Sequence, residues 1–235
     1  MSNNKTVSDN KNEILVEGEP DVPAVVLFAK TAIDETSKIY GPIFARLVSV
    51  HALRFEAEKL KEEPPNIQGL TDVSNYIVTN MNKYTRGYCA VIYGVGKAEA
   101  TLQGSMGAGA KRSAWSAMRS MLENTGLLNN LVGTTGDILE AIDKFNVIGK
   151  QLKTVLTVRF IRDENNQVRE VVPNCPFKDA CKALVKEGVT RVRGGMECMS
   201  LIANTAVAGI ITKKSLDYNL DEFDKPECRG RIFEP

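Results

Sequence analysis

The most informative stretch of the chain runs from Asn174 to Ile211 and reads NCPFKDACKALVKEGVTRVRGGMECMSLIANTAVAGII. It places Cys175 before a short amphipathic pattern and Cys198 at the start of a run that is almost entirely apolar. A helix that is apolar on every side belongs in the centre of a domain. The stretch therefore predicts a short helix over residues 179–187 and a central buried helix over residues 196–211.

Alternating segments surround this stretch. Residues 153–162 alternate between apolar and polar side chains, and residues 168–172 continue this pattern after a polar turn. Such alternation is typical of half-buried strands, so the pair predicts a β-hairpin. Residues 216–221 alternate in the same way, and residues 228–233 are expected to form the return strand.

The chain before the hairpin is mainly helical in its patterns. Apolar residues recur at helical spacing from Pro42 to the charged run 59–63, and again over residues 71–84, 104–122 and 137–148. Short apolar runs predict strands over residues 14–16, 22–28 and 88–93. The fold class that follows is α+β, with an antiparallel sheet meander packed against a helical layer.

The patterns also divide the chain. Residues 1–20 are polar and charged, and we expect a disordered or extended tail there. Residues 21–235 are predicted to form a single α/β domain, in which 21–86 are mainly helical and 87–235 form the core. With 43% hydrophobic residues, the chain can bury a core of its own.

The charge balance excludes several classes of partner. The chain has 30 Lys and Arg residues, 29 Asp and Glu residues and a net charge of +1, so no basic surface for nucleic acid is indicated. The longest apolar run is shorter than the ~20 residues that a membrane-spanning helix needs. Residues 1–20 lack the apolar segment of a secretory signal. We expect a cytoplasmic protein with no membrane span.

Four of the five cysteines lie in the last part of the chain, at Cys175, Cys181, Cys198 and Cys228. Thiolates are preferred ligands of zinc and of iron–sulfur clusters, so these four predict a metal site. The alternative is that all four are inert core thiols, because Cys181 and Cys198 stand where a small buried side chain suits a helix. Glu197 could support such a site, or it could be an exposed residue at a helix start.

No complete catalytic constellation is present in the sequence. His51 is the only histidine, so a serine or cysteine triad would have to use it, and its place on a patterned helix favours a structural role. The pair Gly94 and Gly96 lacks the third glycine of a dinucleotide fingerprint. A stripe of large residues is a core element in most proteins, but it is also the best candidate wall for an apolar pocket; its members are Met106, Trp115, Met118 and Met121.

The order of elements in the last third is distinctive. A hairpin is followed by Asn174-Cys-Pro-Phe177, a helix, the buried segment that begins at Cys198, and a strand pair that ends with residues 228–233. This order resembles the 4-vinyl-reductase-like, or hydrocarbon-binding, domain family, which is similar in fold to small subunits of the TRAPP transport complex. The resemblance covers roughly residues 87–235.

The resemblance implies a ligand-binding module that is commonly a homodimer and holds an apolar or tetrapyrrole-like molecule. Some relatives are sensors that bind a metal through cysteines near the last helix and strand pair. Cys198 matches the helix cysteine of such a site and Cys228 matches the last-strand cysteine. The penultimate strand departs from that pattern, because it offers only acidic residues, Asp217, Asp221 and Glu222.

Three functions are therefore considered. The first is a cytoplasmic, non-catalytic binding or sensor module that holds a small hydrophobic ligand near a cysteine-bound zinc or iron–sulfur centre, with its output protein on another chain. The second is a reductase or accessory redox protein that uses a cysteine-ligated cluster. The third is a dimeric adaptor that needs neither metal nor ligand.

Overall fold

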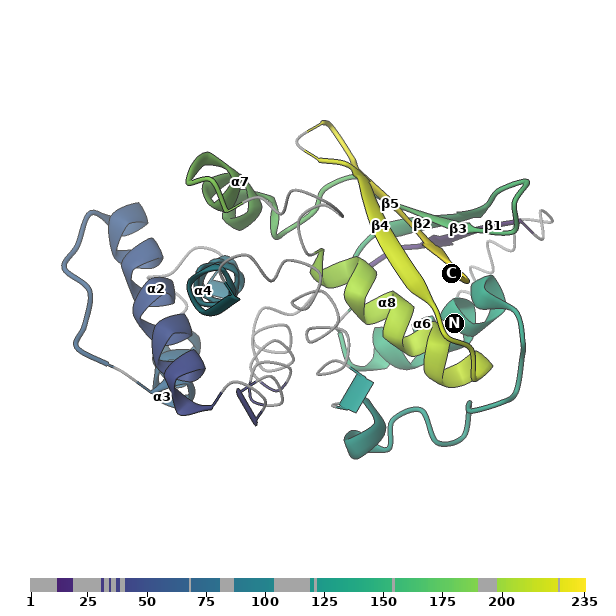
Figure 1. Ribbon diagram of the computed structural model, residues 1–235, viewed down its shortest axis with the longest axis horizontal. Coiled ribbons are helices and arrows are strands. Elements are labelled where there is room, and N and C mark those ends of the chain that lie inside the picture. Colours follow the sequence, from purple (N-terminus) through teal and green to yellow (C-terminus); the bar gives the residue numbers. More distant parts are fainter. Residues whose placement is uncertain are drawn as a thin grey trace, which may run out of the picture.

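A computed structural model of the chain confirms an α+β fold, with a five-stranded antiparallel open sheet packed with helices (Figure 1). The residues that it describes are 12–18, 31, 34, 37, 38, 41–67, 69–80, 87–103, 119, 120, 122–153, 155–189, 198–223 and 225–235. The predicted strand at 22–28 and residues 104–118 of the helix predicted over 104–122 lie outside these residues, whereas residues 119, 120 and 122 are helical as predicted. No helix in the described ranges is long and apolar enough to cross a membrane.

The sheet contains the predicted hairpin at its centre. Its strands are β1 (Glu13–Val16), β2 (Val158–Arg162), β3 (Val168–Val172), β4 (Asp217–Glu222) and β5 (Cys228–Phe233). Their order across the sheet is β1-β2-β3-β5-β4, and every pair of neighbours is antiparallel. The predicted continuous meander is wrong in one respect: β5 pairs with β3, and β4 lies at the edge. Two helices separate β3 from β4 in the chain, so the two strands are not joined as a hairpin.

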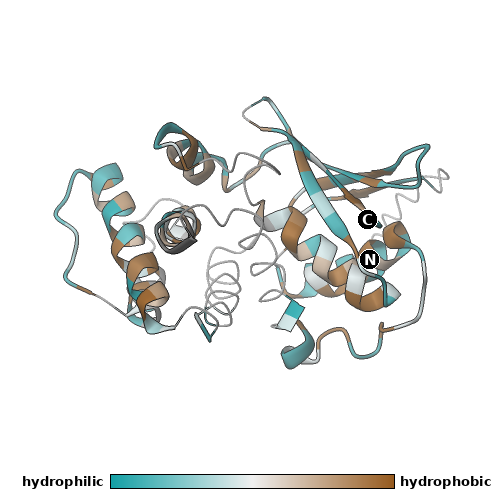
Figure 2. Ribbon diagram, viewed as in Figure 1, coloured by the Kyte–Doolittle hydropathy of each residue, from teal (hydrophilic) through white to brown (hydrophobic). Residues whose placement is uncertain are grey.

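Two helices, α6 (Ile138–Gln151) and α8 (Met199–Thr212), pack against each other and against the sheet. The predicted central helix is α8, and its residues Leu201, Ala206 and Ile211 are almost fully buried. It contacts β4 and β5, whereas α6 contacts β1 and β2. Figure 2 shows brown and white residues along most of α8, as expected for a helix enclosed on several sides.

A second group of helices lies to one side of the sheet (Figure 1). It contains α2 (Pro42–Leu60), α3 (Leu70–Thr79), α4 (Gly87–Gln103) and α7 (Lys178–Lys186). The α4 helix contacts α2, α3 and α7. The helical group thus combines elements from both sides of residue 87, where the sequence suggested that the core begins.

The predicted strand over residues 88–93 is wrong, because these residues form the first turns of α4. Ala90, Val91 and Ile92 are all buried, so the helix is apolar on more than one side and shows no helical period. A short apolar run of this kind fits a buried helix as well as a strand. The pair Gly94 and Gly96 lies inside this helix, where its role is packing.

Gly94 sets how closely α4 approaches α2. A Cβ atom at this position would lie 2.4 Å from the carbonyl oxygen of Val48 and 3.1 Å from the backbone nitrogen of Ala52. Since both atoms belong to the α2 backbone, they cannot move aside as a flexible side chain could. Contact between the two helices therefore requires glycine at this position.

The Gly94→Ala variant should lose about 1–3 kcal/mol of unfolding free energy, because the added methyl group forces α4 away from α2. Gly136→Ala is the matched control, since a Cβ atom there meets nothing within 4 Å. Urea unfolding of both variants measures the difference. Equal stability of the two would show that the contact with α2 does not depend on Gly94.

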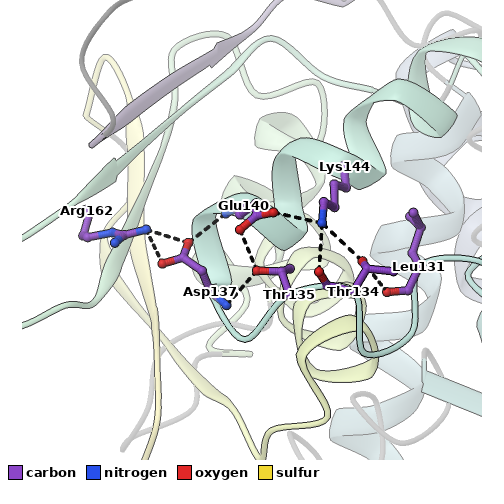
Figure 3. A network of polar contacts seen from close by, with 7 residues as sticks. All are labelled: Leu131, Thr134, Thr135, Asp137, Glu140, Lys144 and Arg162. Atoms are coloured by element: carbon purple, nitrogen blue, oxygen red, sulfur yellow. Dashed lines mark hydrogen bonds and ion pairs between the residues drawn. The ribbon is translucent and has the colours of Figure 1, made fainter.

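The start of α6 is fixed by Asp137, which stands at its N-cap. The Asp137 carboxylate accepts a hydrogen bond from the backbone N–H of Glu140 at 2.9 Å. It also pairs with the Arg162 guanidinium through both of its oxygens at 2.5 Å (Figure 3). Asp137 is therefore both a helix cap and a link from α6 to β2.

Replacement of Asp137 separates these two roles. Asp137→Ala removes the cap and the ion pair and should cost about 1–2 kcal/mol of unfolding free energy. Asp137→Asn keeps a good cap and loses only the ion pair, so it should cost at most about 1 kcal/mol. Urea unfolding compares the two, and an equal loss in both variants would exclude a contribution from the cap.

Candidate thiol and metal site

The site is positioned by a close contact between α8 and β5. A Cβ atom at Gly230 would lie 2.4 Å from Leu201 Cδ1 and 2.7 Å from the carbonyl oxygen of Asn219. Glycine at this position thus lets α8 rest directly on the strand. Cys198 stands at the N-cap of α8, one turn before Leu201, and Cys228 begins β5, two residues before Gly230. The contact therefore places Cys198 and Cys228 at the same end of the α8–β5 interface.

Two of the remaining cysteines, Cys175 and Cys181, follow β3 in the chain, and Cys89 lies on α4. Val172 at the end of β3 pairs with Cys228, and Cys175 follows three residues later. The side chains of Cys175 and Cys228 are buried and hydrogen-bonded to each other. Cys181 lies on α7, and Cys89 on α4 donates a hydrogen bond from its thiol to the carbonyl oxygen of Pro176 at 3.0 Å.

All five cysteines are free thiols, and each lies near enough to another to affect a thiol pKa. The hydrogen bond to Cys228, followed by burial, raises the pKa of Cys175 far above its usual range. Burial, with smaller contributions from Cys228 and Cys89, raises the pKa of Cys181 to about 12. Burial and the nearby Glu170 carboxylate raise the pKa of Cys198. The raised pKa values of Cys175, Cys181 and Cys198 favour the protonated thiol in each case.

Glu170 is the acidic member of the cluster. It lies in the middle of β3 with 1% of its surface exposed. Its Oε2 atom accepts a hydrogen bond from Asn204 Nδ2 at 3.0 Å, and Ser200 also hydrogen-bonds to the carboxylate. Its Oε1 atom is buried and has no hydrogen-bond partner among the residues that the structure describes. Burial raises the pKa of this carboxyl to about 7, and the hydrogen bonds from Ser200 and Asn204 oppose the shift.

The sequence analysis missed Glu170, although a signal for it exists. Residues 168–172 alternate, so Glu170 shares a face with Val168 and Val172. Both valines are buried, and the face that they mark is the one that α8 covers. A charged residue on that face was the available indication of a functional position.

The four predicted cysteines, Cys89 and Glu170 influence one another's pKa values, but among the described residues no three of these side chains are grouped closely enough to hold a metal ion. The remaining predicted site residues, Glu197, Met106, Trp115, Met118 and Met121, lie outside the described residues. His51 lies on α2, and its pKa is lowered by burial and by Lys97 and Arg54. It is placed with the helical group, where Glu187 accepts hydrogen bonds from Tyr93 at 2.6 Å and from Lys97 at 2.7 Å.

The donor atoms of the cluster suit a metal ion, although they are not yet arranged around one. Thiolates with a carboxylate oxygen are ligands that zinc accepts, and Glu170 Oε1 has no partner among the described residues. Within the described part of the chain, no three Cys, His, Asp or Glu side chains already stand in a ligating arrangement. Metal binding would therefore require the side chains to turn toward a common centre.

Comparison of the chain with protein-family models, with curated proteins and with solved structures finds no match. The resemblance to the 4-vinyl-reductase-like domain family accordingly stays a prediction. The function must be argued from the cluster itself.

The raised pKa of Glu170 predicts how stability depends on pH. A carboxyl whose folded-state pKa is about 7, above its ordinary 4.5, stabilises the fold fully below about pH 4.5. That contribution is lost as the pH rises through 7, to a maximum of about 3 kcal/mol. Glu56, another buried carboxyl with a pKa raised to about 7, contributes in the same direction.

Urea unfolding of metal-free, reduced protein between pH 5 and pH 8 measures this effect. The unfolding free energy of the wild type should fall across the range, and Glu170→Gln should flatten part of the fall. The control is Glu164→Gln, in the exposed turn between β2 and β3. An unchanged slope in the Glu170→Gln variant would show that this carboxyl has no raised pKa in the folded protein.

Proposed function

We propose that the chain is a cytoplasmic sensor or small-molecule-binding module that holds a metal ion in its cysteine cluster. The observation that supports the proposal most strongly is the electrostatic coupling of Cys198 and Cys228 to the buried Glu170, and of Cys175 to the same two cysteines. A buried carboxylate oxygen without a partner is unfavourable in a purely structural core, since it costs about 1–3 kcal/mol. A cation at the cluster would supply the missing partner.

Zinc is favoured over an iron–sulfur cluster. Iron–sulfur clusters are held mainly by cysteine thiolates, whereas zinc accepts thiolate and carboxylate ligands together. The three cysteines and Glu170 would act as ligands, and Cys181 is a further thiol on the neighbouring α7 helix. A bound zinc ion would lower the pKa of each thiol and release its proton.

The position of the cluster suggests a sensory role for the metal. Its members come from α4, α7, α8, β3 and β5, and therefore from both the helical group and the sheet. A chain of this size has a core large enough to fold without a metal. We infer that metal binding changes how these elements are held together, and that an output partner on another chain, or the second copy in a homodimer, responds to the change.

A redox function is the second candidate, and one contact favours it. The buried thiols of Cys175 and Cys228 are hydrogen-bonded to each other. In a redox function, a sulfur–sulfur bond would form between the two thiols, and an external disulfide would accept their two electrons and two protons and be reduced to two thiols. The raised pKa of Cys175 slows this chemistry at neutral pH, so metal binding remains the preferred proposal.

The metal content of protein purified without oxygen tests the proposal. Wild-type protein should contain about one zinc per chain, and Cys175→Ser and Cys198→Ser should each lose it. Cys89→Ser is the matched control, because its thiol is engaged with the Pro176 carbonyl and is not among the proposed ligands. The readouts are elemental analysis and acid-labile sulfide.

Two outcomes would contradict the zinc proposal. Iron with acid-labile sulfide, lost in the same two variants, would establish a redox cluster in its place. The second is wild-type protein that holds no stoichiometric metal even after incubation with zinc under reducing conditions. This result would show that the cysteines are inert core thiols.

A further inference from the structure

A hollow of about 370 Å³ lies beside the carboxyl-terminal end of α8. The residues that line it are 119, 122 and 123, then 128, 129 and 132 in the loop that follows, and 210 and 213–215 at the end of α8. Leu122, Leu128 and Ile210 form an apolar floor and are almost fully buried. The volume falls within the range of about 300–1,000 Å³ that is usual for small-molecule sites.

The rim of the hollow is positively charged. Arg119, Lys213 and Lys214 line it, against the single acid Glu123. Arg119 pairs with Glu123 at 2.9 Å, and Lys214 pairs with Glu234. Lys213 has no ion-pair partner among the residues that the structure describes. One ammonium group at the rim is therefore available to an anion.

Lys213 is held at this position by the backbone. It is the C-cap of α8 and has left-handed backbone angles, with φ of 58°. Its side chain extends over Gly133, where an added Cβ atom would lie 3.1 Å from Lys213 Cε. A lysine at a helix carboxyl terminus also complements the helix dipole, which explains its charge but not the apolar hollow beside it.

The wall opposite α8 is fixed before any ligand arrives. The backbone N–H of Gly133 donates to the carbonyl oxygen of Ile211 at 2.6 Å. Lys144 Nζ donates to the carbonyl oxygen of Thr134 at 3.1 Å and to its hydroxyl at 3.3 Å (Figure 3). The loop is thereby attached to both α8 and α6. A preformed wall reduces the ordering cost of binding.

We propose that this hollow binds a small apolar carboxylic acid. The hydrocarbon body would lie on Leu122 and Leu128, and the carboxylate would pair with Lys213. The inference rests on the proposed function in that it names the ligand class of the binding module. Its location is separate from the thiol cluster, because Cys198 and Lys213 cap opposite ends of α8, about 20 Å apart along the helix.

Calorimetric titration of the full-length, metal-analysed protein with octanoate tests the proposal, with 1-octanol and inorganic phosphate as comparison probes. Octanoate should bind with one site per chain and a Kd below 1 mM, corresponding to more than about 4 kcal/mol. Octanol should bind at least about tenfold more weakly, because it lacks the charge that Lys213 would pair with. Phosphate should not bind, because it has no apolar body.

Two variants and one control assign the binding to this hollow. Lys213→Gln should weaken octanoate about tenfold and leave octanol unchanged. Val132→Trp should fill the hollow from its exposed rim and weaken both. Lys153→Gln is the matched control, because Lys153 also has left-handed angles at the end of a helix and does not line the hollow.

Several results would overturn the proposal. The proposal fails if octanoate does not bind, or if octanol or phosphate binds as tightly as octanoate. It also fails if the affinity for octanoate is unchanged in Lys213→Gln. The metal content of the same samples separates this proposal from the previous one. Protein that contains zinc but does not bind octanoate would contradict only the proposal for the hollow. Protein that binds octanoate but contains no zinc would contradict only the proposal for the metal site.

Discussion

The contact between Leu201 on α8 and Gly230 on β5 is the constraint on which the rest of the site depends. Because glycine leaves no Cβ atom between them, the apolar helix can lie directly on the strand. Cys198 lies one helical turn before Leu201, and Cys228 lies two residues before Gly230. Glu170 is brought into the same region because it pairs with Gly230 across the sheet. One residue without a side chain therefore determines the position of three functional groups.

The close packing of α8 on the sheet is unfavourable for Glu170. The carboxyl is enclosed by α8, two side chains of that helix donate to it, and one of its oxygens remains without a partner. A protein that needed only a core could place an apolar residue at this position. Retaining an acid among thiols is consistent with a site that accepts a cation, and perturbed groups of this kind concentrate at functional sites.

Much of this fold could be predicted from periodicity. The β2–β3 hairpin, the buried α8 helix and the return strand β5 each have patterns that only one kind of element satisfies. The segment 88–93 was wrongly predicted as a strand because a helix buried on several sides loses its period. The position of β5 between β3 and β4 was also not predictable, since strand order depends on long-range packing such as the Leu201 contact.

The cysteines of the site were predicted from the sequence, whereas its acid was missed. Four cysteines near the end of the chain indicated metal chemistry through their side-chain type alone, without any knowledge of distance. The alternation of Glu170 with Val168 and Val172 indicated a buried face, but the side chains of α8 that enclose the carboxyl come from a segment distant in sequence. The hollow beside Lys213 is formed by segments distant in sequence, so no local pattern could reveal it.

Zinc K-edge X-ray absorption of the zinc-loaded wild-type protein tests the central claim most directly, because it reports the atoms bound to the metal. The account predicts a four-coordinate shell dominated by sulfur at about 2.3 Å, with one oxygen ligand at about 2.0–2.2 Å. A shell of nitrogen and oxygen atoms alone would contradict it. Such a result would place the bound metal away from the cysteines and Glu170.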